Sequence, residues 1–124
     1  MSQDIVADAL NKMLNAKKAH KENLLINMHS KMLVSILAIA KLKGYVKDYK
    51  IDKNKLNVDL GGVHFCKAIK PRFVIGFIEI EKYVKRFLPA KNIGIIIIST
   101  SGGLMTHQTA MEKNLGGSLI AYFY

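Results

Sequence analysis

The sequence predicts an α+β fold made of two small lobes. In several segments apolar residues recur at three- and four-residue spacings, as they do in amphipathic helices. Other segments are short and either alternating or continuously apolar, as strands are. The pair Gly61-Gly62 separates two groups of such segments. We therefore expect an N-terminal α+β lobe over 1–62 and a mostly β C-terminal lobe over 63–124.

The N-terminal lobe is expected to contain two helices and three strands. The first helix covers 2–19, with Ser2 as its N-cap. The second begins after Ser30, a hydroxyl residue suited to capping, and ends at Gly44, a residue type favoured just past a helix end. The strands are predicted over 24–28, 45–51 and 56–60, which gives the order helix, strand, helix, strand, strand.

The C-terminal lobe is expected to be mostly strands with two short helices. Four consecutive isoleucines at 95–98 favour a strand that is buried on both faces. Gly116-Gly117 is expected to permit the return of the last strand. The predicted strands cover 63–69, 73–77, 95–98 and 118–124, and the predicted helices cover 79–87 and 106–114.

Composition and charge limit the classes of function. The chain has 124 residues, half of them hydrophobic, and a formal net charge of +10. Such an excess predicts a polyanionic partner, with nucleic acid favoured over an anionic membrane. The alternative is a protein-interaction module that is merely basic. The first residues include acids, which is not typical of a signal peptide. No apolar run is long enough to span a membrane. We therefore expect a cytoplasmic protein.

A hydroxyl- and glycine-rich loop follows the isoleucine strand. Its residues are Ser99, Thr100, Ser101, Gly102 and Gly103. Hydroxyl groups and closely approachable backbone N–H groups suit the phosphate and sugar oxygens of nucleic acids. We therefore predict that this loop is the working surface of the chain. After it, Thr106 is expected to cap the short helix, and His107 to lie beside the loop at the start of that helix.

Basic residues form three further candidate contacts. Lys17 and Lys18 stand at the end of the first helix, where they either contact phosphates or simply complement the helix dipole. Lys31 opens the second helix. Lys70 and Arg72 flank a proline in a basic turn.

Metal and catalytic motifs are weak by comparison. The four histidines are scattered, and Cys66 is the only cysteine, which excludes an internal disulfide and leaves no CxxC pair. Ser101 is not in a GxSxG motif, so a hydrolase that uses Ser101 and His107 is a distant alternative. We expect no enzyme activity, no metal and no cofactor.

Several ordered motifs resemble the small-subunit ribosomal protein S-eight family in its archaeal-type form. The most specific is Ser99-Thr100-Ser101-x-Gly103-x-Met105-Thr106-His107, followed by Gly116-Gly117. Two others are Ile69-Lys70-Pro71-Arg72-Phe73 and Arg86-Phe87-Leu88-Pro89-Ala90. In two places the chain departs from the family, since Gly102 stands where lysine is common and Ser118 where a charged residue is frequent.

The resemblance implies a structural protein of the small ribosomal subunit. Family members bind an irregular helix in the central domain of the small-subunit RNA and support its assembly, so the implied partners are this RNA and neighbouring ribosomal proteins, with no membrane and no small-molecule substrate. The family's contacts correspond here to Ser99, Thr100, Ser101, Ser30, Lys31, Lys70 and Arg72. To these the residues themselves add Gly102, Gly103, Thr106, His107, Lys17 and Lys18 as predicted RNA contacts.

Overall fold

The computed structural model describes residues 5–70, 72–90 and 92–124. The chain divides into two compact units, the first ending at Lys67 and the second beginning at Ala68. Helices and antiparallel sheets occur in both units, which confirms the predicted α+β class. The division into lobes at 1–62 and 63–124 stays a prediction.

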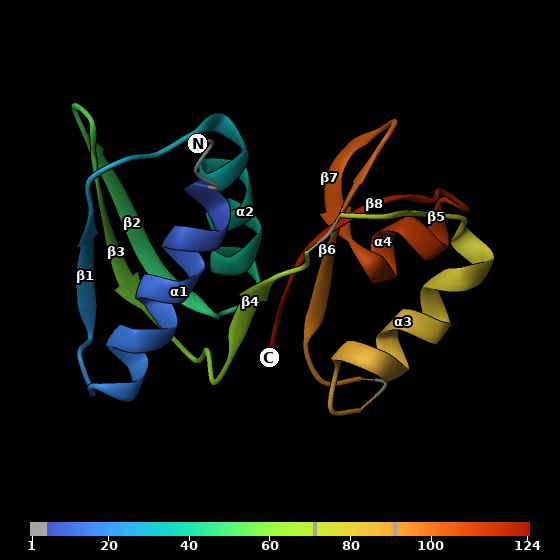
Figure 1. Cartoon of the computed structure of the whole chain (residues 1–124), viewed down its shortest axis with the longest axis horizontal. Coiled ribbons are helices and arrows are strands. Elements are labelled where there is room, and N and C mark those ends of the chain that lie inside the picture. The colour runs from blue at the N-terminus through green and yellow to red at the C-terminus, as the bar shows by residue number, and fades with distance from the viewer. Residues whose placement is uncertain (1–4, 71, 91) are drawn as a thin grey trace. The chain divides into compact units, whose positions relative to one another are not determined.

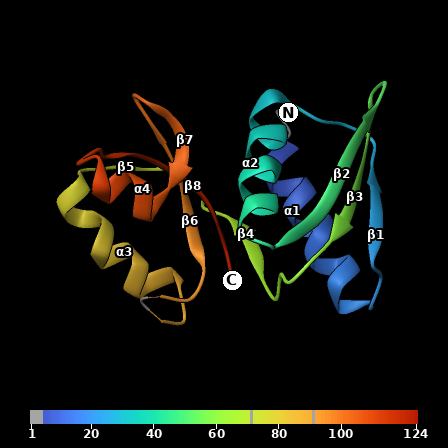
Figure 2. The same ribbon diagram turned by 180° about the vertical axis from the view of Figure 1, so that it is seen from behind.

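The first unit packs two helices against a three-stranded antiparallel sheet. Its sheet has the order β1-β3-β2, and Figures 1 and 2 show both helices on the same side of it. The elements are α1 (Ile5–Lys18), β1 (Asn23–Ile26), α2 (Lys31–Leu42), β2 (Val46–Asp52) and β3 (Lys55–Leu60). The predicted order of helices and strands in this unit is confirmed.

Local sequence signals set the ends of α2. The Ser30 side chain accepts a hydrogen bond from the Leu33 N–H, which confirms the predicted N-cap. At the other end Gly44 has φ +85°, and the Tyr45 N–H donates to the Ala40 carbonyl at 2.9 Å. This left-handed closing turn is the Schellman motif, which satisfies the last helix carbonyls. The predicted cap Ser2 lies outside the described residues.

Among the described residues, the buried core of the first unit is apolar apart from one thiol. The side chains of Leu10, Leu33 and Leu56 have no exposed surface. Cys66 is buried among the core residues, and its Sγ donates to the Leu10 carbonyl at 3.4 Å. Burial raises the pKa of the Cys66 thiol to about 12. The thiol is therefore protonated and behaves as a small core residue.

The second unit is built on a five-stranded sheet. The sheet has the order β4-β8-β6-β7, with β5 also paired to β8. Strand β4 (Cys66–Ala68) spans the boundary between the two units. The other elements are β5 (Val74–Ile75), the 3₁₀ turn η1 (Phe77–Glu79), α3 (Ile80–Phe87), β6 (Ile95–Thr100), β7 (Gly103–Thr106), α4 (His107–Glu112) and β8 (Gly117–Phe123).

Strand β6 runs through the middle of this unit and is buried on both faces. Its four isoleucines are each at most 3% exposed, which confirms the prediction from the isoleucine run. Ile96 and Ile98 belong to a core cluster that joins β6 to both helices and to β8. The other members of that cluster are Ile69, Ile75, Ile80, Val84, Leu88, Met105, Ala110 and Leu119.

Three segments differ from the prediction. The strand expected over 63–69 covers only Cys66–Ala68, and the extended segment expected over 73–77 shortens to Val74–Ile75 before η1 begins. Gly103, predicted as the last residue of the loop, is the first residue of the strand β7 (Gly103–Thr106), which the sequence did not predict. In each case strand length depends on hydrogen-bonding partners far along the chain, which local apolar patterns do not specify.

Candidate nucleic-acid interface

The predicted loop at 99–103 is the tip of the β6–β7 hairpin, called the hairpin tip below. Figure 1 shows this hairpin projecting from the rest of its unit. Ser99 pairs with Leu104 and Thr100 with Gly103, so Ser101 and Gly102 form the turn. Both turn residues are exposed. The structure thus brings all five predicted loop residues together.

The Thr100 hydroxyl fixes the turn from inside. Its Oγ1 accepts a hydrogen bond from the Gly102 N–H at 3.1 Å and donates to the Gly103 carbonyl at 2.9 Å. Gly103 has φ +103°, a backbone conformation that favours glycine. Within the described chain no partner lies in hydrogen-bonding reach of the exposed Ser101 hydroxyl. The tip therefore holds a fixed backbone and presents the Ser101 donor to solvent.

The two glycines at 116–117 lock the base of the hairpin. A Cβ at Gly117 would collide with the carbonyl group of Ser99, and a Cβ at Gly116 would collide with the Ile75 carbonyl oxygen. Gly117 also pairs with Thr100 across β6 and β8. The absence of side chains lets three backbone segments meet closely, so these glycines have a structural part in placing the tip.

Thr106 and His107 are buried and support the hairpin from behind. Their residues are 4% and 2% exposed. The Thr106 Oγ1 accepts from the Thr109 N–H, which confirms the predicted cap of α4. The His107 Nδ1 accepts from the Ile96 N–H at 3.1 Å, so its proton sits on Nε2. Burial favours a structural part for both side chains over direct contact with a ligand.

The start of α2 forms a second exposed polar site. Lys31 is exposed beside the capping Ser30, whose hydroxyl can still donate a hydrogen bond. The His29 Nε2 lies 3.2 Å from the Lys53 carbonyl oxygen, which ties this helix start to the β2–β3 turn. The sequence did not indicate Lys53 as part of this site. His29, which precedes the cap of α2, could have indicated a contact here, but its partner Lys53 is 24 residues away in the sequence.

Of the other predicted basic residues, Lys18, Lys70 and Arg72 are exposed, and Lys17 is half-buried. Lys17 and Lys18 lie in the last turn of α1, at the opposite end of the first unit from the start of α2 (Figures 1 and 2). Lys70 and Arg72 are exposed between β4 and β5, and the proline between them lies outside the described residues. Within the first unit, Lys17 and Lys18 are therefore separate from the polar site at the start of α2.

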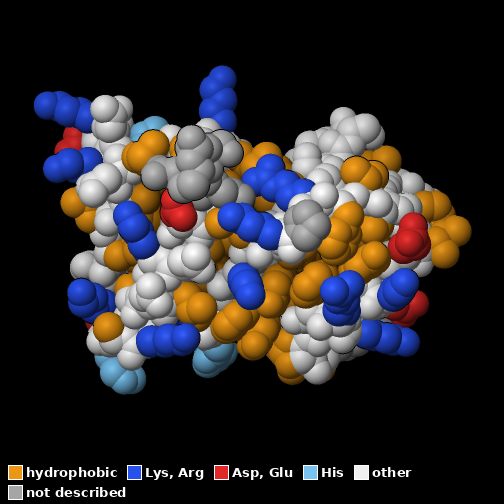
Figure 3. Space-filling model, viewed as in Figure 1, with side chains coloured by type: hydrophobic (Ala, Val, Ile, Leu, Met, Phe, Trp, Pro, Cys, Tyr) orange, Lys and Arg blue, Asp and Glu red, His pale blue; other side chains and the backbone are white. Residues whose placement is uncertain are grey.

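Basic side chains are scattered over the surface and outnumber acidic ones. Figure 3 shows more Lys and Arg than Asp and Glu side chains on one face. One local exception is the ion pair of Lys41 with Asp48 at 3.1 Å. The hydrogen bond from Lys41 lowers the pKa of Asp48, and a bond from the Tyr49 N–H adds to this.

Two further findings concern other classes of function. No three His, Cys, Asp or Glu side chains of the described residues are grouped as metal ligands would be. None of the described helices is long and apolar enough to cross a membrane.

Comparisons with known proteins decide the family. A family profile described as "Ribosomal protein S8" matches residues 4–124. The chain belongs to the ribosomal protein S8 family. The sequence is 39% identical over 129 residues to the small ribosomal subunit protein uS8 of Nanoarchaeum equitans, covering 100% of both chains. It is 35% identical over 127 residues to uS8A and to uS8B of Schizosaccharomyces pombe, covering 98% of each chain.

Family membership confirms the resemblance drawn from the hairpin and glycine motifs. S8 proteins are structural components of the ribosome, so the chain is not an enzyme. The alternative of a hydrolase that uses Ser101 and His107 is therefore rejected, and the burial of His107 beneath the hairpin agrees with this.

Proposed function

We propose that the chain is a component of the small ribosomal subunit that binds the central domain of the subunit's RNA directly and supports its assembly. The observation that carries the proposal is the hairpin tip. Its exposed turn is uncharged, its backbone is fixed by the Thr100 hydroxyl, and its base is locked against Gly117. Fixed neutral donors of this kind suit the ribose hydroxyls and exposed base edges of an irregular RNA helix.

The basic residues supply attraction rather than recognition in this proposal. Lys17, Lys18 and Lys31 have no carboxylate within ion-pair distance in the described structure, so they are available to phosphates. Phosphate contacts position a protein on RNA without reading its sequence. Lys70 and Arg72 are assigned the same part. Neighbouring ribosomal proteins are the other expected partners, in the cytoplasm.

The test is a salt titration of binding to the central-domain helix, with a scrambled duplex measured alongside. Ser101→Ala is expected to weaken binding to the true helix by about five- to tenfold, because one exposed hydrogen bond is worth about 1 kcal/mol. Binding to the scrambled duplex should not change. Ser35→Ala, at an exposed serine of α2, is the matched control and should change neither.

Equal losses on both RNAs would contradict specific recognition by the hairpin tip. Equal binding of the wild-type chain to both RNAs, collapsing with salt, would favour the basic protein-interaction module instead. A second variant, Lys17→Ala with Lys18→Ala, should flatten the salt dependence by about 0.9 per phosphate contact removed. An unchanged slope would mean that these two lysines only complement the helix dipole.

A further inference from the structure

A pocket of about 530 Å³ opens in the first unit where α1 ends. It lies between the last turn of α1, the start of β1 and the end of β3. Three lysines, Lys17, Lys21 and Lys47, line it together with the carboxylates of Glu22 and Asp59. This volume falls in the range of about 300–1,000 Å³ in which small ligands bind.

The pocket exists because the chain reverses sharply at His20. His20 has φ 59°, and the Lys21 N–H donates to the Ala16 carbonyl at 2.9 Å. The same closing turn at the end of α2 uses Gly44, the residue type with no steric cost there. At the end of α1 the chain instead keeps an imidazole at the rim of the pocket. A non-glycine residue in this conformation is a local strain of the kind that gathers at binding sites.

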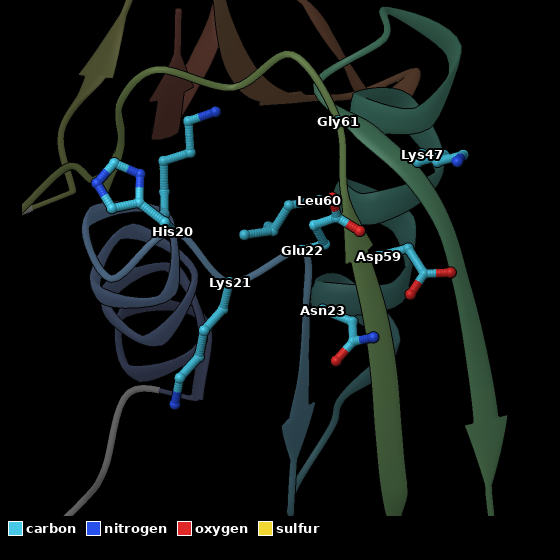
Figure 4. A pocket seen from close by; sticks show the side chains of 9 residues that line it. His20, Lys21, Glu22, Asn23, Lys47, Asp59, Leu60 and Gly61 are labelled. Atoms are coloured by element: carbon cyan, nitrogen blue, oxygen red, sulfur yellow. The ribbon is translucent and has the colours of Figure 1, made fainter.

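The lining combines cationic and anionic side chains, as Figure 4 shows. His20 and Lys21 lie on the α1 side, whereas Glu22 and Asp59 lie on the strand side. The side chain of Leu60 extends between the two sides. No ion pair within the described chain joins the pocket's ammonium groups to its carboxylates. Lys47 lies on the strand side near Asp59, so both signs of charge occur there. The ammonium groups and the carboxylates of the pocket are thus uncommitted.

We infer that this pocket binds one ribonucleotide unit, presented by RNA as an extruded nucleotide. The lysines supply charge-assisted donors for the phosphate. Glu22 and Asp59 accept hydrogen bonds from the ribose hydroxyls. A simple anion without hydroxyl donors could not use these two carboxylates. Unpaired RNA nucleotides are commonly splayed out and bound in this manner. The RNA-borne part of this inference rests on the proposed function.

The first experiment titrates the full-length chain with free nucleotides and follows backbone amide shifts by NMR. Adenosine monophosphate is expected to shift the amides of Lys21, Glu22 and Gly61. Its 2′-deoxy form and inorganic phosphate should bind more weakly, because each lacks ribose hydroxyls that donate hydrogen bonds to the carboxylates. Asp59→Asn should remove the preference for the ribose form over the 2′-deoxy form. Lys21→Ala should weaken the binding of all three ligands. Asp52→Asn, at the exposed β2–β3 turn, is the matched control.

The second experiment measures affinity for the central-domain helix. Lys21→Ala and Asp59→Asn should each weaken binding by about tenfold, as expected for hydrogen bonds that involve a charged group. A nucleotide shift with unchanged RNA affinity would assign the pocket to free ribonucleotides and overturn the RNA-borne part. No shift and no loss of RNA affinity would overturn the inference entirely. If the wild-type chain binds nucleotides but does not bind the central-domain helix, the proposed function is contradicted while the pocket assignment stands.

Discussion

The hairpin tip and the α1 pocket hold their polar groups in opposite ways. The tip has no charged side chain, and the Thr100 hydroxyl and the close contact of Gly117 with Ser99 fix its backbone. The pocket has five charged side chains, all on flexible stems, and only its closing turn at His20 is fixed.

This difference separates two parts of RNA binding. Fixed, neutral donors lose little freedom on binding and respond strongly to the shape of the partner. Lysines on long stems attract any polyanion and respond to salt. Variants of the second unit should therefore change discrimination between RNAs, and variants of the first unit should change salt dependence.

The largest expected effect is that of Gly117→Ala. The added methyl group would collide with the Ser99 carbonyl and lie 3.0 Å from the Ile98 side chain. We expect a loss of about 3 kcal/mol in the free energy of unfolding, the upper part of the range for overpacking, together with loss of preference for the true RNA helix. Urea unfolding and RNA titration measure both.

Gly102→Ala is the matched control for that prediction. The nearest atoms to its Cβ would be 3.5 Å away, an ordinary contact, so its stability should stay within about 0.5 kcal/mol of the wild type. Similar losses for the two variants would mean that the close approach at Gly117 does not hold the tip.

The next effect belongs to the first unit and depends on pH. The folded Cys66 has a pKa of about 12 against an ordinary value of 9.0, so the unfolded chain loses this proton first as pH rises. The stability contributed by the buried neutral thiol therefore falls above pH 9, by about 1.4 kcal/mol between roughly pH 8 and roughly pH 10. Denaturant unfolding of the wild type and of Cys66→Ala isolates this contribution, since the other groups are shared. A stability difference that does not change with pH would show that the thiol titrates normally.

A smaller effect is expected from Thr100→Val, which removes the hydroxyl that closes the turn. The Gly102 N–H and the Gly103 carbonyl lose their partner, which should lower stability by about 1 kcal/mol. Discrimination between true and scrambled RNA should fall while the salt slope stays the same. Thr100→Ser keeps the hydroxyl and should retain discrimination. Loss of discrimination in Thr100→Ser as well would show that the hydroxyl alone does not hold the tip.

The smallest effect on stability is expected from Gly102→Lys. The position is exposed and has room for a side chain. A lysine there restores the residue common in the family and gives the tip a charge like those of the pocket. The salt dependence of RNA binding should steepen by about 0.9, the value for one added phosphate contact. An unchanged slope would show that no phosphate approaches the turn.

The sequence alone was informative wherever interactions are local. Ser30 and Thr106 cap their helices through bonds to residues three positions away, and Gly44 closes α2 within one turn. The isoleucine run predicted the buried strand because four adjacent β-branched residues admit few alternatives. The family motif at 99–107 was also read from adjacent residues.

Only the tertiary structure decided which of those residues face solvent. The sequence predicts that His107 contacts RNA, but in the structure His107 is buried and its Nδ1 accepts a hydrogen bond from the Ile96 N–H of β6. The need for glycine at 117 comes from the Ser99 carbonyl, and the pocket joins the end of α1 to residues near 47 and 60. Such features depend on partners far apart in the chain, which become neighbours only when the sheets form.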